Sequence, residues 1–93
     1  MTYQITNYTI QQANKHNLIV RPSNKPNKKI DVYHSGGKFL ESIGDSRYGD
    51  YPTYIKIKGK EYADQRRELY YVRHGRDKGQ KYSKDWLAKT LLW

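Results

Sequence analysis

The scarcity of aliphatic side chains is the feature that most constrains this chain. Leu, Ile, Val and Phe make up only seventeen of the 93 residues, while the formal net charge is +9. Few apolar residues combined with a high net charge are typical of chains that stay disordered. Ten tyrosines and two tryptophans offset this shortage, because each ring can bury about 150–250 Å². We therefore expect a folded domain with an aromatic-rich core and an attached segment that is disordered or depends on a partner.

The length and composition exclude several classes of protein. A chain of 93 residues is long enough for one domain and too short for two. Without cysteine it cannot form disulfides or sulfur-ligated metal sites. No apolar run approaches the roughly 18 residues of a membrane span, and the first residues lack the pattern of a secretory signal. We expect a soluble protein that is neither secreted nor membrane-bound.

The chain divides by composition near residue 28. Residues 1–28 are polar and basic, and we predict an N-terminal arm that continues into a mobile loop. Tyr3 and Ile5, then Tyr8 and Ile10, alternate like a weak edge strand, so this segment is either such a strand or an arm that becomes ordered on a partner.

Residues 29–93 are predicted to form a single small α+β domain. Alternating residues around the turn at residues 35–37 favour a β-hairpin over 29–44, and residues 54–58 alternate like a short third strand. Residues 60–74 have helical spacing and end before Gly75, and a short helix follows from Ser83. We expect a small antiparallel hairpin sheet packed on a main helix and a short C-terminal helix, with the basic N-terminal arm attached.

The residues that could carry catalysis are too few and too scattered. His16, His34 and His74 lie in three different predicted elements, and none has the paired spacing of a metal site. The chain also lacks a phosphate-binding glycine loop and a nucleophile motif. We therefore predict a binding protein without metal or cofactor. A nuclease that uses His74 as a base is a distant alternative.

The basic residues are concentrated in one part of the chain. Ten of the eighteen Lys and Arg residues lie between Lys56 and Lys84, where there are only four acids. Arg66 and Arg73 are seven residues apart and would share one helix face, which could pair with phosphates. The alternative is a solvated face with ion pairs along the helix. The candidate polyanion or partner site comprises Arg66, Arg67, Arg73, Arg76, Lys78 and Lys81.

Three motifs occur in order in the second part of the chain. Residues 44–53 read Gly-x-x-x-Tyr-x-Asp-Tyr-x-Thr, residues 66–74 read Arg-Arg-x-x-Tyr-x-x-Arg-His, and residues 83–93 read Ser-x-x-Trp-x-Ala-x-x-Leu-Leu-Trp. Together they resemble a family of small uncharacterised basic proteins of bacteriophages and large DNA viruses. The chain departs from that pattern at Glu61 and Ala63, where relatives often carry His and Asp.

The resemblance implies a viral or phage setting. Its leading implication is a minor virion-associated structural protein that binds capsid protein or packaged DNA through a basic face, located in the virion or the host-cell cytoplasm. A nucleic-acid-binding module outside the virion is the alternative. The arginines of the second motif would be either this binding face or buried partners of Asp50. The structural core is expected to contain Tyr48, Tyr51, Tyr70, Trp86, Leu91 and Trp93, with their aromatic rings in one cluster.

Overall fold

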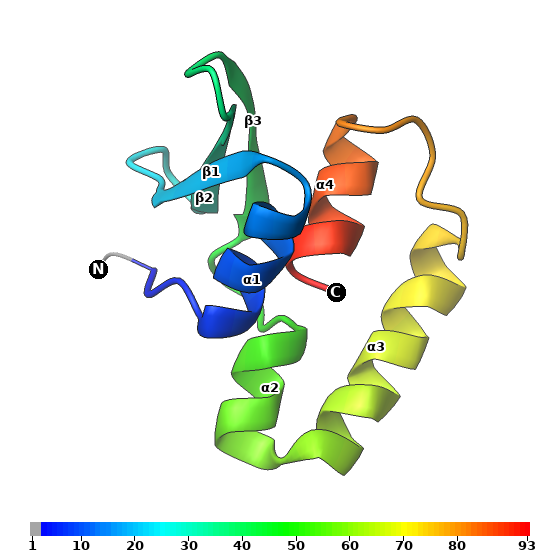
Figure 1. Cartoon of the computed structure of the whole chain (residues 1–93). Helices are drawn as coiled ribbons and strands as arrows, with labels where there is room; N and C mark the ends of the chain where they lie inside the picture. The colour runs from blue at the N-terminus through cyan, green and yellow to red at the C-terminus, as the bar shows by residue number, and fades with distance from the viewer. Residues whose placement is uncertain (1–2) are drawn as a thin grey trace.

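A computed structural model describes residues 3–93 and contains one sheet and four helices (Figure 1). The elements in chain order are α1 (Asn7–Lys15), β1 (Leu18–Pro22), β2 (Lys28–His34), β3 (Phe39–Asp45), α2 (Tyr51–Lys58), α3 (Lys60–His74) and α4 (Lys84–Leu91). Helices α1 and α4 pack on the sheet, whereas α2 and α3 form a helical hairpin that extends away from it (Figure 1). The predicted small α+β fold is confirmed.

The three strands form an antiparallel sheet in the order β1-β2-β3. In the β2–β3 hairpin, the backbone N–H of His34 donates to the carbonyl of Lys38 at 2.8 Å, and that of Gly37 donates to the carbonyl of His34 at 2.8 Å. A bulge between Val32 and Tyr33 shifts the register near this turn. The predicted hairpin is thus confirmed, and β1 supplies the third strand.

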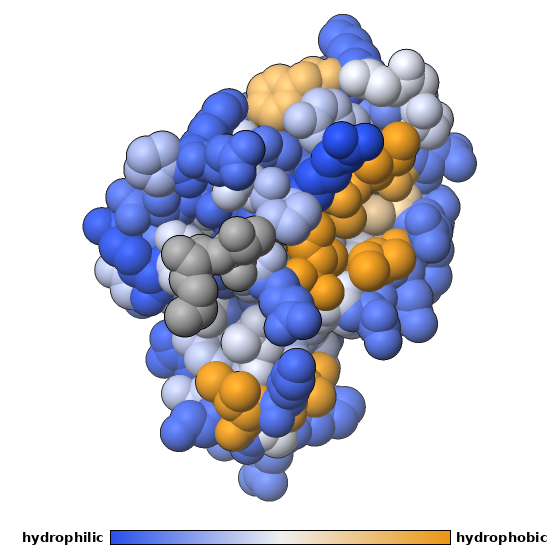
Figure 2. Space-filling model, turned by 90° about the vertical axis from the view of Figure 1, so that its left-hand side faces the viewer, coloured by the Kyte–Doolittle hydropathy of each residue, from blue (hydrophilic) through white to orange (hydrophobic). Residues whose placement is uncertain are grey.

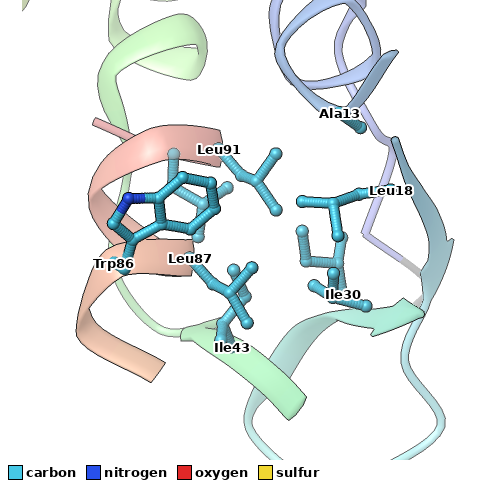
Figure 3. Packing of buried hydrophobic residues seen from close by; sticks show 9 residues of the cluster. Ala13, Leu18, Ile30, Ile43, Trp86, Leu87 and Leu91 are labelled. Atoms are coloured by element: carbon cyan, nitrogen blue, oxygen red, sulfur yellow. The ribbon is translucent and has the colours of Figure 1, made fainter. Parts of the chain in front are cut away.

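The core lies between one face of the sheet and helix α4. In Figure 3, Trp86, Leu87 and Leu91 of α4 point towards Ile30 and Ile43 of the sheet. Because the spacing of four residues between Leu87 and Leu91 stacks them on one helix face, α4 presents a continuous apolar stripe to the strands. The buried cluster comprises Ala13, Leu18, Ile30, Val32, Ile43, Trp86, Leu87, Leu91 and Leu92.

The prediction of an N-terminal arm over residues 1–28 is wrong for residues 7–22, which form α1 and β1. Thr6 caps α1 by accepting a hydrogen bond from the N–H of Thr9, and the buried hydroxyl of Thr9 donates to the carbonyl of Leu91 at 2.8 Å. Helix α1 buries Thr9 and Ala13. Because these residues are small or polar, the helix lacks the apolar period on which sequence interpretation depends.

The predicted strand over residues 54–58 is also wrong, since these residues belong to α2. The carboxylate of Asp50 accepts from the N–H of Thr53 at 3.0 Å and caps the helix, and Pro52 in the first turn suits a helix start. Ile55 and Ile57 are exposed, so their alternation does not reflect a buried sheet face.

The two predicted helices near the C-terminus are confirmed. Helix α3 ends at His74, where the N–H of Gly75 donates to the carbonyl of Tyr71 and Gly75 has a φ of +85°, a conformation that favours glycine. Helix α4 begins after Ser83, whose hydroxyl accepts from the N–H of Trp86.

Candidate functional site

A cleft of about 610 Å³ separates α3 from the sheet and α4. One wall is α3, and the other consists of the ends of β2 and β3, the following loop and α4. The lining combines cations, aromatic rings and apolar side chains, and includes Lys28, Asp45, Tyr48, Tyr54, Arg66, Leu69, Tyr70, Val72, Arg73, His74, Lys84 and Trp93.

Four cations of the cleft have no acidic partner within residues 3–93. Arg66 and Arg73 come from α3, whereas Lys28 and Lys84 come from β2 and α4. None of them takes part in an ion pair within residues 3–93. The one acid of the lining, Asp45, is bound by Arg47 at 2.8 Å. The cleft therefore carries a concentrated positive charge.

Lys84 affects the ionisation of Lys28. Burial lowers the pKa of Lys28 from its ordinary value, and the neighbouring ammonium of Lys84 lowers it further. Asp45 and Glu41 act in the opposite direction without reversing the shift. Two like charges brought together in this way are mutually destabilising, and an anion placed between them would relieve the repulsion.

Aromatic and apolar side chains lie among these cations. Tyr48 is 69% exposed, and Leu69 and Val72 of α3 are 55% and 71% exposed. Tyr54 lies deeper, with its ring centroid 6.2 Å from that of Trp93. Exposed rings beside cations can accept flat, partly apolar anions as well as simple ones.

Helix α3 is held in place by Arg67 and Tyr70. The Arg67 guanidinium carbon lies 3.5 Å from the ring centroid of Tyr51, and its Nε donates to the carbonyl of Trp93 at 2.9 Å. The ring of Tyr70 stacks on Trp93 with centroids 4.4 Å apart, and burial is the main cause that raises the pKa of Tyr70 to about 12. Arg67 thus has a structural position and does not line the cleft.

Asp50 occupies the centre of the first motif. Its buried carboxylate accepts from Lys29 Nζ at 2.8 Å and from the Tyr3 hydroxyl at 2.7 Å, besides capping α2. Burial would raise the pKa of Asp50, but Lys29 and these hydrogen bonds hold it below its ordinary value. The predicted alternative in which the arginines are buried partners of Asp50 is therefore wrong, because Lys29 has that role.

Two glycines allow close packing, one at the end of β3 and one in the loop after it. A Cβ atom at Gly49 would lie 2.4 Å from the Tyr54 ring, and one at Gly44 would lie 2.8 Å from Leu92. The short distances explain why the first motif has glycine at these two positions, and the absence of a side chain at Gly49 leaves room for the Tyr54 ring.

The structure unites only part of the predicted basic site. Arg66 and Arg73 both line the cleft, but Arg76 is paired with Glu68. Lys78 and Lys81 are exposed in the loop between α3 and α4, and neither is part of the lining. Sequence reasoning missed Lys28 and Lys84, because they lie far apart in the chain and only the fold brings them together.

The predicted aromatic cluster is only partly correct. Tyr51, Trp86 and Leu91 are buried, and Tyr70 and Trp93 are half-buried. The prediction of Tyr48 as a core residue is wrong, since its ring points into solvent at the cleft. Nor do the rings form one cluster. Trp86 lies in the main core, whereas Tyr70 stacks on Trp93 at the base of α3.

Neither a metal site nor a membrane-spanning helix occurs in residues 3–93. Residues 3–93 contain no group of three or more His, Cys, Asp or Glu side chains that could hold a metal ion. Within the same residues, no helix has the length and apolar content needed to cross a membrane.

No family model matches the sequence, and no curated protein or solved structure matches it either.

Proposed function

We propose that this protein binds nucleic acid in the cleft between α3 and the sheet. The observation that carries the proposal is a set of four cations from three elements that line one cleft and have no acidic partner in the described part of the chain: Lys28, Arg66, Arg73 and Lys84. Unpaired cations grouped in this way are suited to phosphate groups, and each arginine can offer two parallel hydrogen bonds.

The side chains between the cations favour nucleic acid over an anion without bases. Tyr48 presents an exposed ring at the cleft, and Leu69 and Val72 present exposed apolar atoms on the opposite wall. A nucleic acid offers both phosphates for the cations and flat base faces for the ring. A polyanion without bases would make no contact with these apolar groups.

The viral setting of the proposal rests on the motif resemblance alone. In that setting the ligand would be packaged genome, and the protein would be a minor component of the particle. Capsid protein is the other acidic partner that the resemblance implies, and a measurement with nucleic acid separates the two.

The test compares the unmodified protein with Arg66→Ala/Arg73→Ala by fluorescence anisotropy of labelled oligonucleotides. Both arginines are exposed and neither belongs to an ion pair within residues 3–93, so the variant should fold. We expect it to lose most of its binding. The matched control is Lys56→Ala/Lys58→Ala, which removes two exposed cations from α2 and should bind like the unmodified protein.

Salt gives the second part of the test. If four phosphates are contacted, the logarithm of affinity should fall with a slope of about −2.8 to −3.6 against the logarithm of salt concentration, which is a loss of about 50- to 150-fold between 50 and 200 mM. Absence of binding at low salt would contradict the proposal and leave an acidic protein surface as the partner. Equal loss in both double variants would show that the cleft is not the site.

A further inference from the structure

The cations of the cleft face one another across a hollow. Arg66 and Arg73 lie on the α3 wall, and Lys28 and Lys84 lie on the opposite wall. A cleft of about 610 Å³ is the size of a small-molecule pocket. It can enclose a short piece of one flexible strand, whereas a stiff duplex carries its phosphates on a convex surface that cannot enter the hollow.

The outward surface of α3 argues against insertion of this helix into a duplex groove. Glu61 and Glu68 are exposed on α3, on faces that do not line the cleft. A helix that reads the major groove is flanked by phosphates on both sides, and the Glu61 carboxylate would then repel the backbone, whereas Glu68 is paired with Arg76. Arg66 and Arg73, which belong to no ion pair within residues 3–93, line the cleft instead.

Lys28 and Lys84 line the same cleft from β2 and α4 and provide a specific place for a phosphate. The two ammonium groups come from β2 and α4 and lie close enough for Lys84 to disfavour the charged form of Lys28. Repulsion of this kind is a cost in the free protein. A phosphate between the two groups would convert the repulsion into two charge-assisted hydrogen bonds.

Tyr48 supplies a surface for a base at the same cleft. The residue follows β3 in the loop that leads to α2, its ring is 69% exposed, and its backbone N–H is fixed by the carbonyl of Asp45 at 3.1 Å. The Arg47 guanidinium carbon lies 6.0 Å from the centroid of this ring. A mostly exposed ring with a fixed backbone is suited to stacking on an unpaired base, an interaction that tolerates any sequence.

We propose that the cleft binds single-stranded nucleic acid, with the backbone phosphate held between Lys28 and Lys84 and a base stacked on Tyr48. This inference rests on the proposed function and specifies its substrate class. It requires the bases to be unpaired, since a paired base cannot expose its face to Tyr48.

The experiment uses three labelled probes of equal length: a ten-nucleotide thymidine strand, an abasic strand with the same phosphates, and a duplex. We expect the thymidine strand to bind at least tenfold more tightly than either of the others, because stacking contributes a factor of this order for each base. Equal or tighter binding of the duplex would overturn the single-strand inference while leaving the proposed function intact. Absence of binding to all three probes would overturn both.

Two variants test the assigned residues. Lys28→Gln/Lys84→Gln should weaken binding of the thymidine strand about tenfold and reduce the steepness of the salt dependence by about 0.7 to 1.4. The same variant should have an equal or higher melting temperature, because the repulsion is gone. Lys15→Gln/Lys38→Gln is the charge-matched control, since both lysines are exposed and neither lines the cleft.

Tyr48→Ala should reduce affinity for the thymidine strand and leave affinity for the abasic strand unchanged. Tyr48→Phe should restore binding because it keeps the ring. Unchanged binding in the lysine variant would overturn the phosphate assignment, and equal loss of both strands in Tyr48→Ala would overturn the stacking assignment.

Discussion

At the scale of single residues, the carboxylate of Asp50 connects three parts of the chain. It accepts from Tyr3 near the N-terminus, from Lys29 of β2 and from the first turn of α2. Lys29 and Asp50 are both buried and lie 2.8 Å apart. A buried charge that loses its partner is far more costly than an exposed one, so this residue should affect stability more than any surface ion pair.

We therefore predict that Asp50→Asn destabilises the fold by about 3–5 kcal/mol, because it leaves the Lys29 ammonium buried without a counter-charge. Urea denaturation at neutral pH measures the loss. Asp45→Asn is the control, since the Asp45–Arg47 pair is exposed to solvent and its removal should change stability little. Equal effects of the two substitutions would contradict the assigned role of Asp50.

The same carboxylate predicts an acid limit to stability. Because the pKa of Asp50 is lowered in the folded protein, its contribution is complete above the unfolded pKa of about 3.9 and is lost as the pH falls through the folded value. Melting temperature followed downward from pH 6 should drop below about pH 4, and the drop should be smaller in Asp50→Asn. A steeper drop in the variant would contradict the assignment.

Gly49 determines whether Tyr54 can lie against the cleft. A methyl group at this position would meet the Tyr54 ring at 2.4 Å, so Gly49→Ala should cost about 1–3 kcal/mol and displace the ring. Gly36→Ala is the matched control, because the nearest atom to its Cβ would be 4.0 Å away. Chemical denaturation of both variants measures the difference, and equal stabilities would contradict the close packing.

At the scale of elements, the sequence predicts best where a helix or strand has an apolar face. The hairpin and α4 carry such faces, and α3 has a clear glycine end at Gly75. The buried residues of helix α1 are Thr9 and Ala13, so the sequence shows no helical period of large apolar residues there. The alternation of apolar and polar residues in α2 is misleading, because Ile55 and Ile57 are exposed. The two missed helices are indicated instead by their N-cap residues, Thr6 for α1 and Asp50 for α2.

The connection between α3 and α4 depends on one buried lysine. Lys89 Nζ donates to the carbonyls of His74 and Asp77 at 3.0 and 2.6 Å and pairs with Asp85 at 3.0 Å. Lys89→Met keeps the apolar stem but removes these hydrogen bonds. We predict faster amide hydrogen exchange in the last turn of α3 and in the following loop. Lys78→Met in the same loop should exchange like the unmodified protein, and unchanged exchange in Lys89→Met would contradict the role of Lys89.

At the scale of the whole molecule, the cleft depends on contacts that no local pattern encodes. Arg66 and Arg73 can be grouped from their helical spacing. Lys28 and Lys84 line the same cleft only because α4 packs on β3, which is the neighbour of β2 in the sheet. The exposure of Tyr48 likewise depends on how the loop after β3 packs around Gly44 and Gly49. The sequence therefore predicts half of the cationic site, and the tertiary fold supplies the rest.

The net charge of +9 gives a prediction for the protein as a whole. Salt should raise the melting temperature of the free protein, because it screens self-repulsion within a strongly basic molecule and within the cleft. The same salt should weaken binding of an oligonucleotide, because the release of counterions is entropically less favourable when the surrounding salt concentration is higher.

Thermal denaturation between 50 and 500 mM NaCl, with and without a thymidine strand, separates the two effects. The ligand-induced rise in melting temperature should shrink with salt, while the baseline rises. A baseline that falls with salt would mean that favourable ion pairs, rather than repulsion, dominate the free protein, and it would contradict the view of the cleft as an unpaired cationic site.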